Sequence, residues 1–522
     1  MIRSVIRLLL VLLVPAVFAS GMTSVEVTLV LTQAISRAQE IEPKAVIAVV
    51  DREGYVLGVW SMDGAPGAIA VLDAITKAGT AAFLSSNKNA FTSRTAGFIV
   101  QQHFPPGIHN RPNGPLVGVN FSNLSFTDVN RFKNPNSGYI PNFTSGINGD
   151  PIAGPAPLTG LAGSPGGVPL FSGGKLIGGV GVAGQTIAPA ISPFSILSDI
   201  QVQSQQRYDP DEDVALAGQI GFQPAAKIFG GNVSIDGIRV PYVVGKTRLG
   251  DVLPLGSVGS PVPPYPVVNS PAVAYPTGLF GGQVCEIRAP IVADPVIGPI
   301  SGQLRLTSSE VTTILSQASA RAKITRAGIR LPAGQKAETF ITVVNNPAMS
   351  NTAPVILGTI RTPDATVFSW DVAAQKARTA VFFSNDSRAF SSRTVGFMAQ
   401  QFYPPGIANT APGPFYKMQE QYSLLPTGVK NPLNGVELTT SLSVPNPNVP
   451  NGITIFPGGF PLYRNGVMIG AIGVSGDGID QDDIIAAAGT VGFVAPPAIR
   501  ADQKQYQGAR LPYAKFPRNP DL

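Results

Sequence analysis

The chain has 522 residues, of which 44% are hydrophobic and 13% are charged, and its formal net charge is +6. The low charge content argues against disorder driven by charge, and the dispersed basic residues give no support for nucleic-acid binding. Cys285 is the single cysteine, which excludes an internal disulfide, an iron–sulfur cluster and a Cys-rich zinc site. The 57 glycines and 49 prolines predict many turns and long ordered loops.

Residues 1–20 are typical of a secretory signal peptide. Arg3 and Arg7 give a positive start, and an apolar run over 8–18 leads to small residues suited to cleavage. That run is short for a membrane span, which needs about 20 apolar residues. We therefore expect cleavage at the end of this segment and a periplasmic or secreted mature protein without a membrane anchor.

The dominant feature of the sequence is an internal repeat. Residues 77–108 read KAGTAAFLSSNKNAFTSRTAGFIVQQHFPPGI, and residues 376–407 read KARTAVFFSNDSRAFSSRTVGFMAQQFYPPGI, without a gap and at a constant offset of 299. A second pair of blocks follows, GGVPLFSGGKLIGGVGVAG at 166–184 and GGFPLYRNGVMIGAIGVSG at 458–476. The chain therefore contains two diverged copies of one module.

The repeat predicts the domain organisation. The expected segments are a signal peptide over 1–20, copy one over 24–245, a Pro/Gly-rich ordered linker over 246–304, copy two over 305–516 and a tail over 517–522. Two similar modules in one chain are expected to pack together as a built-in pseudo-dimer.

Within each copy the predicted order is helix, hairpin, helix, hairpin, helix. Copy one has helices at 25–40, 66–84 and 94–102, strands at 45–50 and 55–60, the hairpin at 166–184 and a last helix opened by Asp211. Copy two has helices at 308–323 and 366–383, strands at 340–345 and 355–360, the hairpin at 458–476 and a last helix opened by Asp482. Thr307 followed by Glu310 predicts an N-cap. This order predicts an α+β fold in which an antiparallel sheet is flanked by helices.

Several of these blocks together resemble the GlcG/HbpS-like haem-binding family. The resembling residues are Val49-Val50-Asp51-x-x-Gly54, Met62-Asp63-Gly64-Ala65, Lys77-Ala78-x-Thr80-Ala81, the Gly-Gly-x-Pro-Leu hairpin and Gly473-Val474-Ser475-Gly476. The resemblance implies two tandem profilin-like modules and the binding of a tetrapyrrole, usually haem. Copy two departs at Asn345, where copy one has Asp51, and copy one departs at Ala183, where copy two has Ser475.

The two histidines of the chain, His103 and His109, lie in one segment of copy one. Histidine is a common ligand of haem iron, so both are candidate metal and cofactor ligands. Copy two has Phe402 and Ala408 at the equivalent positions, so a site common to both copies cannot use histidine. The alternative is a loop histidine without a special role.

Residues shared by both copies are candidates for a common ligand site. The shared cations would pair with a carboxylate of the ligand, and the shared aromatic rings would stack on a flat macrocycle. These candidates are Lys77, Arg94 and Phe104 in copy one, and Lys376, Arg393 and Tyr403 in copy two. The alternative is structural, with cations that cap and bridge elements and aromatic rings in the core. The glycine pairs at 166–167 and 458–459 are predicted to allow positive φ or close backbone approach.

The sequence contains no recognised catalytic arrangement of nucleophile and base, no His-Glu-x-x-His and no phosphate-binding glycine loop. The acidic runs at 211–213 and 482–483 suit helix N-termini, with metal binding as the alternative. We therefore predict an exported, non-catalytic haem-binding protein, a carrier or sensor, whose partner is haem or another flat molecule and which has a homo-oligomer as one option. The alternatives are a structural or interaction module without a ligand, and a haem-degrading enzyme.

Overall fold

The computed structural model describes much of the chain after the predicted signal segment. The described residues are 21–515 apart from 101–103, 107, 109–113, 118, 120–121, 124–126, 133–159, 185–206, 272–274, 329–333, 350–351, 417 and 419–451. No helix among the described residues combines the length and the apolarity that crossing a membrane requires.

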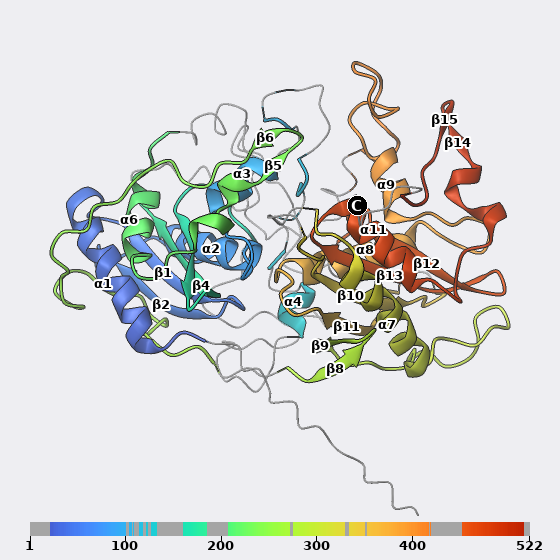
Figure 1. Cartoon of the computed structure of the whole chain (residues 1–522), viewed down its shortest axis with the longest axis horizontal. Helices are drawn as coiled ribbons and strands as arrows, with labels where there is room; N and C mark the ends of the chain where they lie inside the picture. Colours follow the sequence, from blue (N-terminus) through green and yellow to red (C-terminus); the bar gives the residue numbers. More distant parts are fainter. Residues whose placement is uncertain are drawn as a thin grey trace, which may run out of the picture.

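Copy one forms the left half of the molecule in Figure 1. Its main elements are α1 (Ser24–Ile41), β1 (Val46–Asp51), β2 (Val56–Ser61), α2 (Ala68–Leu84), α3 (Ser93–Ile99), α4 (Asp128–Arg131), β3 (Gly167–Ser172), β4 (Lys175–Ala183) and α6 (Pro210–Gly218). Together with β7 (Ser260–Pro261), the strands form a sheet in the order β3-β4-β1-β2-β7, in which every pairing is antiparallel. The third helix ends at Ile99, three residues before the end predicted at 102.

Copy two repeats this plan in the right half of the figure. Its main elements are α7 (Ser308–Ile324), β10 (Thr339–Asn345), β11 (Ile356–Arg361), α8 (Ser369–Phe382), α9 (Ser392–Met398), β12 (Gly459–Arg464), β13 (Val467–Gly476) and α11 (Ile479–Gly489). Together with β8 (Thr277–Phe280) and β9 (Gln283–Ala289), the strands form a sheet in the order β12-β13-β10-β11-β9-β8. Both copies also share a register shift between the fourth and fifth pairs of their first hairpin, at Val49/Val50 and at Val343/Val344.

Shorter elements complete the two halves. They are η4 (Ala226–Ile228), η5 (Gly230–Asn232), β5 (Ser234–Ile235), β6 (Ile238–Arg239), β7 (Ser260–Pro261), β8 (Thr277–Phe280), β9 (Gln283–Ala289), η6 (Pro497–Ile499), η7 (Ala501–Gln503), β14 (Gln505–Tyr506) and β15 (Ala509–Arg510). The segment between the copies therefore supplies an edge strand to each sheet, β7 to the first and the β8–β9 hairpin to the second.

The helix starts are set locally. Thr307 is the predicted N-cap, and with Glu310 it forms a capping box, in which the threonine hydroxyl accepts from the backbone of Glu310 and the glutamate accepts from the backbone of Thr307. Thr23 and Glu26 form the same box in copy one. Each box satisfies backbone N–H groups that a helix N-terminus otherwise leaves without partners.

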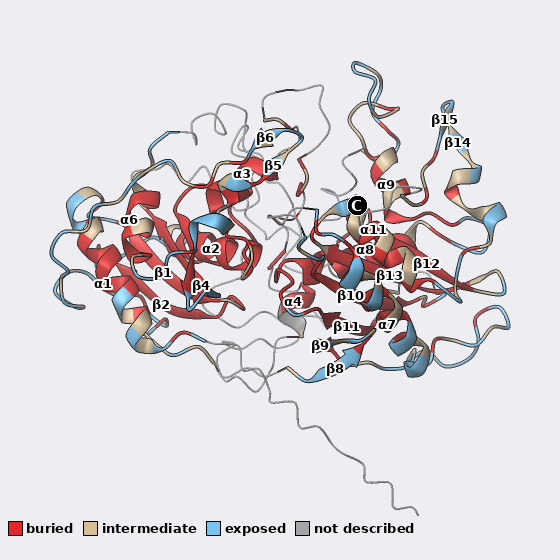
Figure 2. Ribbon diagram, viewed as in Figure 1, coloured by how far each residue is buried: buried red, intermediate tan, exposed pale blue. Residues whose placement is uncertain are grey.

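Each sheet is covered on both faces. Along β1, Val46, Ala48 and Val50 pack in the core beneath α2, whereas Ile47 and Val49 pack in the core beneath α1 and α6. This alternation follows from the two-residue period of a strand. Because both faces are covered, the strands are buried along nearly their whole length, as Figure 2 shows.

The glycine pairs that open the second hairpins have the conformation that was predicted. Gly166 and Gly458 have φ of 113° and 117°, a region that favours glycine. A Cβ atom on Gly167 would lie 2.2 Å from the carbonyl oxygen of Lys77, and one on Gly459 would lie 2.3 Å from that of Lys376. These glycines therefore let the helix that carries the lysine pack directly on the hairpin.

The two copies pack together as a pseudo-dimer. The core beneath α2 continues into copy two, where it includes Phe340, Trp370 and Val372. Ion pairs also cross the interface: Arg288 on β9 donates two hydrogen bonds of 2.8 and 2.9 Å to the carboxylate of Glu53. The protein is therefore an α+β chain of two modules, and one of its hydrophobic core clusters spans both of them.

Candidate functional site

In copy one the lysine of the repeated block, Lys77, contacts three acceptors that all belong to the same copy. Lys77 Nζ lies 2.7 Å from Asp211 Oδ2 at the start of α6 and 3.0 Å from Asp73 Oδ2 one helical turn before it. It also donates to the carbonyl oxygen of Val182 at 2.9 Å. Because an ammonium has three N–H donors, these three acceptors fully occupy it.

Copy two repeats the arrangement with one carboxylate fewer. Lys376 Nζ lies 2.8 Å from Asp482 Oδ2 at the start of α11 and donates to the carbonyl oxygen of Val474 at 2.7 Å. Val372 stands where copy one has Asp73. Among the described residues Lys376 therefore donates to two acceptors, where its counterpart has three.

This difference changes the electrostatics of the two lysines. Burial disfavours the ammonium of Lys77, but the carboxylates of Asp211 and Asp73 outweigh it and raise the pKa of Lys77 above its usual range. Burial dominates in copy two, where it lowers the pKa of Lys376 and raises the pKa of Asp482 to about 6. The pKa values of Lys376 and Asp482 therefore approach each other, which favours transfer of a proton between the two groups.

The shared arginines also differ between the copies. Arg94 is 1% exposed and binds both carboxylate oxygens of Glu212, at 2.7 and 3.0 Å. Arg393 is 17% exposed and divides its bonds between Asp483 at 2.8 Å and Asp480 at 2.7 Å. The arginine of copy one is thus sealed in the interior, whereas that of copy two reaches a surface.

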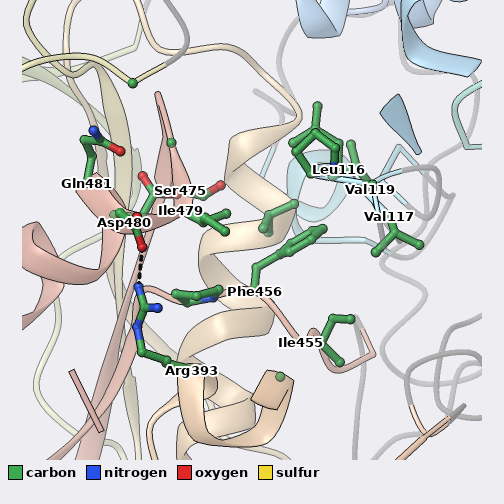
Figure 3. Close-up of a pocket in the computed structure, with 18 of the residues that line it drawn as sticks. Leu116, Val117, Val119, Arg393, Ile455, Phe456, Ser475, Ile479, Asp480 and Gln481 are labelled. Carbon is green, nitrogen blue, oxygen red and sulfur yellow. Dashed lines mark hydrogen bonds and ion pairs between the residues drawn. The ribbon is translucent and has the colours of Figure 1, made fainter. Parts of the chain in front are cut away.

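That surface is the wall of a cavity of about 730 Å³ between the two copies (Figure 3). Its polar wall comes from copy two and includes Lys376, Arg393, Ser475, Asp480, Gln481 and Asp482. The opposite wall comes from copy one and is mainly apolar, with Leu116, Val117, Val119, Val233 and Ile235 beside Ser234 and Asp236. Phe368, Val372, Phe397, Ile455 and Phe456 of copy two add further apolar surface. This volume lies within the range typical of small-molecule sites.

Part of the copy-one wall belongs to a segment that we call the arm, the described residues of 114–132. The arm is held in place by two residues of α8. Asp371 on α8 accepts hydrogen bonds from the hydroxyl of Ser122 at 2.7 Å and from backbone N–H groups of the arm at 2.8 and 2.9 Å. Arg378 on α8 binds both carboxylate oxygens of Asp128, at 2.5 and 3.1 Å. Copy one has Leu72 and Gly79 at the positions of Asp371 and Arg378, so this clamp acts in one direction only.

The structure divides the predicted site residues into three groups. Lys376 and Arg393 line the cavity, whereas Lys77 and Arg94 are enclosed by carboxylates of copy one. The aromatic candidates lie in the core: Phe104 packs edge-on against Phe98, and Tyr403 packs against Phe397 and Tyr506. His103 and His109 lie outside the described residues, so their role stays a prediction.

Several residues of the cavity were missed in the sequence. Phe456 and the apolar residues of the arm carry no motif, and Phe456 has no aromatic counterpart in copy one, which has Ser164 there. The carboxylate partners of the shared Lys and Arg residues could have been predicted from the sequence, because acidic runs recur in both copies, at 211–213 and 482–483. Among the described residues, no group of His, Cys, Asp and Glu side chains is arranged to hold a metal ion.

The fold and the cavity define a class of protein, a duplicated α+β module with a cavity between its copies. Residues 22–188 and 335–490 match the model of the family described as haem degrading protein HbpS-like. The two segments cover more than half of the chain, so the protein belongs to the HbpS-like family and carries two copies of its domain. No curated protein matches the chain.

Solved structures with similarity to the chain include three relatives. The PduOC–heme complex is 20% identical, with coverage of 36% of this chain and 96% of that chain and a TM-score of 0.23. Klebsiella pneumoniae protein ORFY, of the DUF336 family, is 19% identical, with coverage of 38% and 96% and a TM-score of 0.23. A double mutant of Streptomyces reticuli HbpS is 20% identical, with coverage of 39% and 99% and a TM-score of 0.22.

Proposed function

We propose that this protein binds haem or a related tetrapyrrole in the cavity between its copies, and that it acts as an exported carrier or sensor without catalysing a reaction. The cavity is the observation that carries the proposal. Membership of a family described as haem degrading supports the ligand class, and the signal-like pattern of residues 1–20 supports export.

The lining of the cavity fits a flat amphiphilic molecule. Its apolar walls from the two copies would cover the faces of a macrocycle, with Phe456 among the rings available to stack on it. Arg393 stands at the polar wall and would pair with a carboxylate at the edge of the ligand. Bound haem would supply strong visible absorption and a redox-active iron.

The residues that line the cavity suit the macrocycle of haem better than they suit its iron. The described residues that line this cavity include no His, Cys, Met or Tyr, the usual axial ligands of haem iron. We therefore assign the cavity residues a binding role and place no chemical step on the metal.

The direct test is a titration of the full mature chain with haem, followed in the Soret region. We expect a shifted band that saturates at one haem per chain. Ile479→Asp places a carboxylate at the cavity wall on an exposed residue and should weaken binding about tenfold or more. Val491→Asp, at another exposed apolar residue but outside the lining, is the control and should bind as the wild type does.

Two results would count against the proposal. No Soret shift at micromolar haem would remove the ligand, and equal binding by Ile479→Asp and Val491→Asp would remove the cavity as its site. Loss of the Soret band with time would instead favour the haem-degrading alternative. Separate His103→Ala and His109→Ala variants complete the test, because unchanged spectra for both would remove histidine as an iron ligand.

A specific observation favours a structural role for copy one. Its Lys77 is paired with Asp73 and Asp211, and its Arg94 is paired with Glu212. Copy one thus supplies a wall of the cavity and the arm, while the cations that face a ligand belong to copy two.

A further inference from the structure

Lys376 is a buried amine on the wall of a cavity that is large enough to admit a small molecule. Its side chain is 1% exposed, yet it is part of the lining together with Val372. Its Nζ donates to Asp482 and to the carbonyl oxygen of Val474, so one of its three N–H positions has no acceptor among the described residues.

The surroundings of Lys376 favour a neutral amine. Phe368, Val372 and Phe456 give the cavity apolar walls, and a charged ammonium is costly next to such surfaces. Asp482, 2.8 Å away, is positioned to take the proton. The direction of the pKa shifts agrees, because burial lowers the pKa of Lys376 and raises that of Asp482. Lysines desolvated in this way are the ones that act as nucleophiles.

We propose that Lys376 is a carbonyl-reactive amine that forms an imine with an aldehyde of apolar or aromatic body that enters the cavity. The ammonium first gives a proton to Asp482 Oδ2, and the neutral nitrogen attacks the carbonyl carbon to form a C–N bond. The nitrogen then loses its remaining protons while the carbonyl oxygen gains two and leaves as water. One imine and one water are formed from one amine and one aldehyde, without oxidation or reduction.

The chain carries its own control for this reactivity. Lys77 is the counterpart of Lys376, lies on the equivalent helix and is equally buried. Its third acceptor is Asp73, at 3.0 Å, where copy two has Val372. Two carboxylates hold Lys77 as an ammonium, and an ammonium has no lone pair with which to attack a carbonyl.

The test uses the full chain at pH 7, incubated with benzaldehyde and cyanoborohydride, which reduces an imine to a stable secondary amine. Peptide mass spectrometry then gives the rate of modification at every lysine. We expect Lys376 to be labelled at least tenfold faster than Lys77 and faster than the exposed lysines, which stay protonated at this pH. Labelling of Lys376 no faster than that of Lys77 would overturn the proposal.

A pair of variants separates charge from access. Val372→Asp restores the second carboxylate of copy one and should reduce labelling of Lys376 to the level of Lys77, whereas Val372→Ala should leave it at least as fast as in the wild type. Equal labelling of two folded variants would contradict the proposed role of the neutral amine. The comparison of Lys376 with Lys77 in the wild type remains valid even if a variant fails to fold. It is also independent of haem binding, because it measures the modification of a residue and not a porphyrin spectrum.

Discussion

The two copies contain the same lysine, the same arginine and the same acidic helix start, yet they use them differently. In copy one, Asp73 completes the partners of Lys77, and the arginine is sealed inside. In copy two, Val372 replaces that carboxylate, and both cations reach the cavity. The difference between Asp73 and Val372 thus separates a fully paired lysine from a lysine that lines a cavity.

The arm shows the same division of roles. It belongs to copy one by sequence but is clamped by Asp371 and Arg378 of copy two, and Figure 1 shows α4 lying against the right half of the molecule. Copy one has no acid or arginine at those two positions. The copies therefore divide the construction of the site, with one supplying the arm and the other supplying the clamp and the polar wall.

The largest expected effect comes from breaking this clamp. Arg378→Ala leaves the carboxylate of Asp128, which is fully buried, without its bidentate cation, and should lower the free energy of unfolding by about 3–5 kcal/mol. Urea unfolding of the two chains measures it. Arg388→Ala, an exposed arginine on the same copy, is the control and should change stability by less than about 0.5 kcal/mol. Equal effects would mean that the arm is not held by this pair.

A second prediction compares the two lysines directly. Lys77→Met leaves the buried carboxylate of Asp211 and the half-buried carboxylate of Asp73 without their shared cation, and should cost about 3–5 kcal/mol at pH 7. Lys376→Met leaves Asp482 alone, and this group is already inclined to take up a proton, so we expect a loss of about 1–3 kcal/mol. Urea unfolding of both variants gives the comparison, and a larger loss in copy two would reverse our account of the asymmetry.

Much of the fold was predictable because its signals are local. The hairpins, the N-cap at Thr307 and the glycine pairs depend on neighbours within a few residues, and all of these were found where the sequence indicated. The partner of Lys376 lies 106 residues away on α11, so pairing it with Asp482 required the tertiary arrangement. The cavity was even harder to predict from the sequence, because its apolar wall comes from the other copy and Phe456 lies outside every repeated motif.

The third prediction concerns pH and the carboxylate of Asp482. Burial raises its pKa to about 6, above the value near 3.9 of an unfolded chain, so the folded state binds the proton more tightly. The stability that it contributes is complete below about pH 4 and is lost as the pH rises through 6. The stability of the wild type relative to Asp482→Asn should therefore fall by about 2–3 kcal/mol between pH 4 and pH 7. Urea unfolding at intervals across that range measures it, and a constant difference would place the pair in its fully charged form throughout.

The smallest expected effect tests whether the cavity is a site at all. Phe456 is one of the rings of its lining, and truncation to Ala removes a surface on which a flat ligand would stack, so we expect porphyrin affinity to fall about tenfold, or about 1.4 kcal/mol. Phe493→Ala removes the same ring from copy two at a half-buried residue outside the lining and should bind haem normally. Both variants are first matched for folding by urea unfolding, since truncation of a core ring also lowers stability. If the two bind alike, the cations of copy two are structural like those of copy one, and the asymmetry between the copies concerns stability alone.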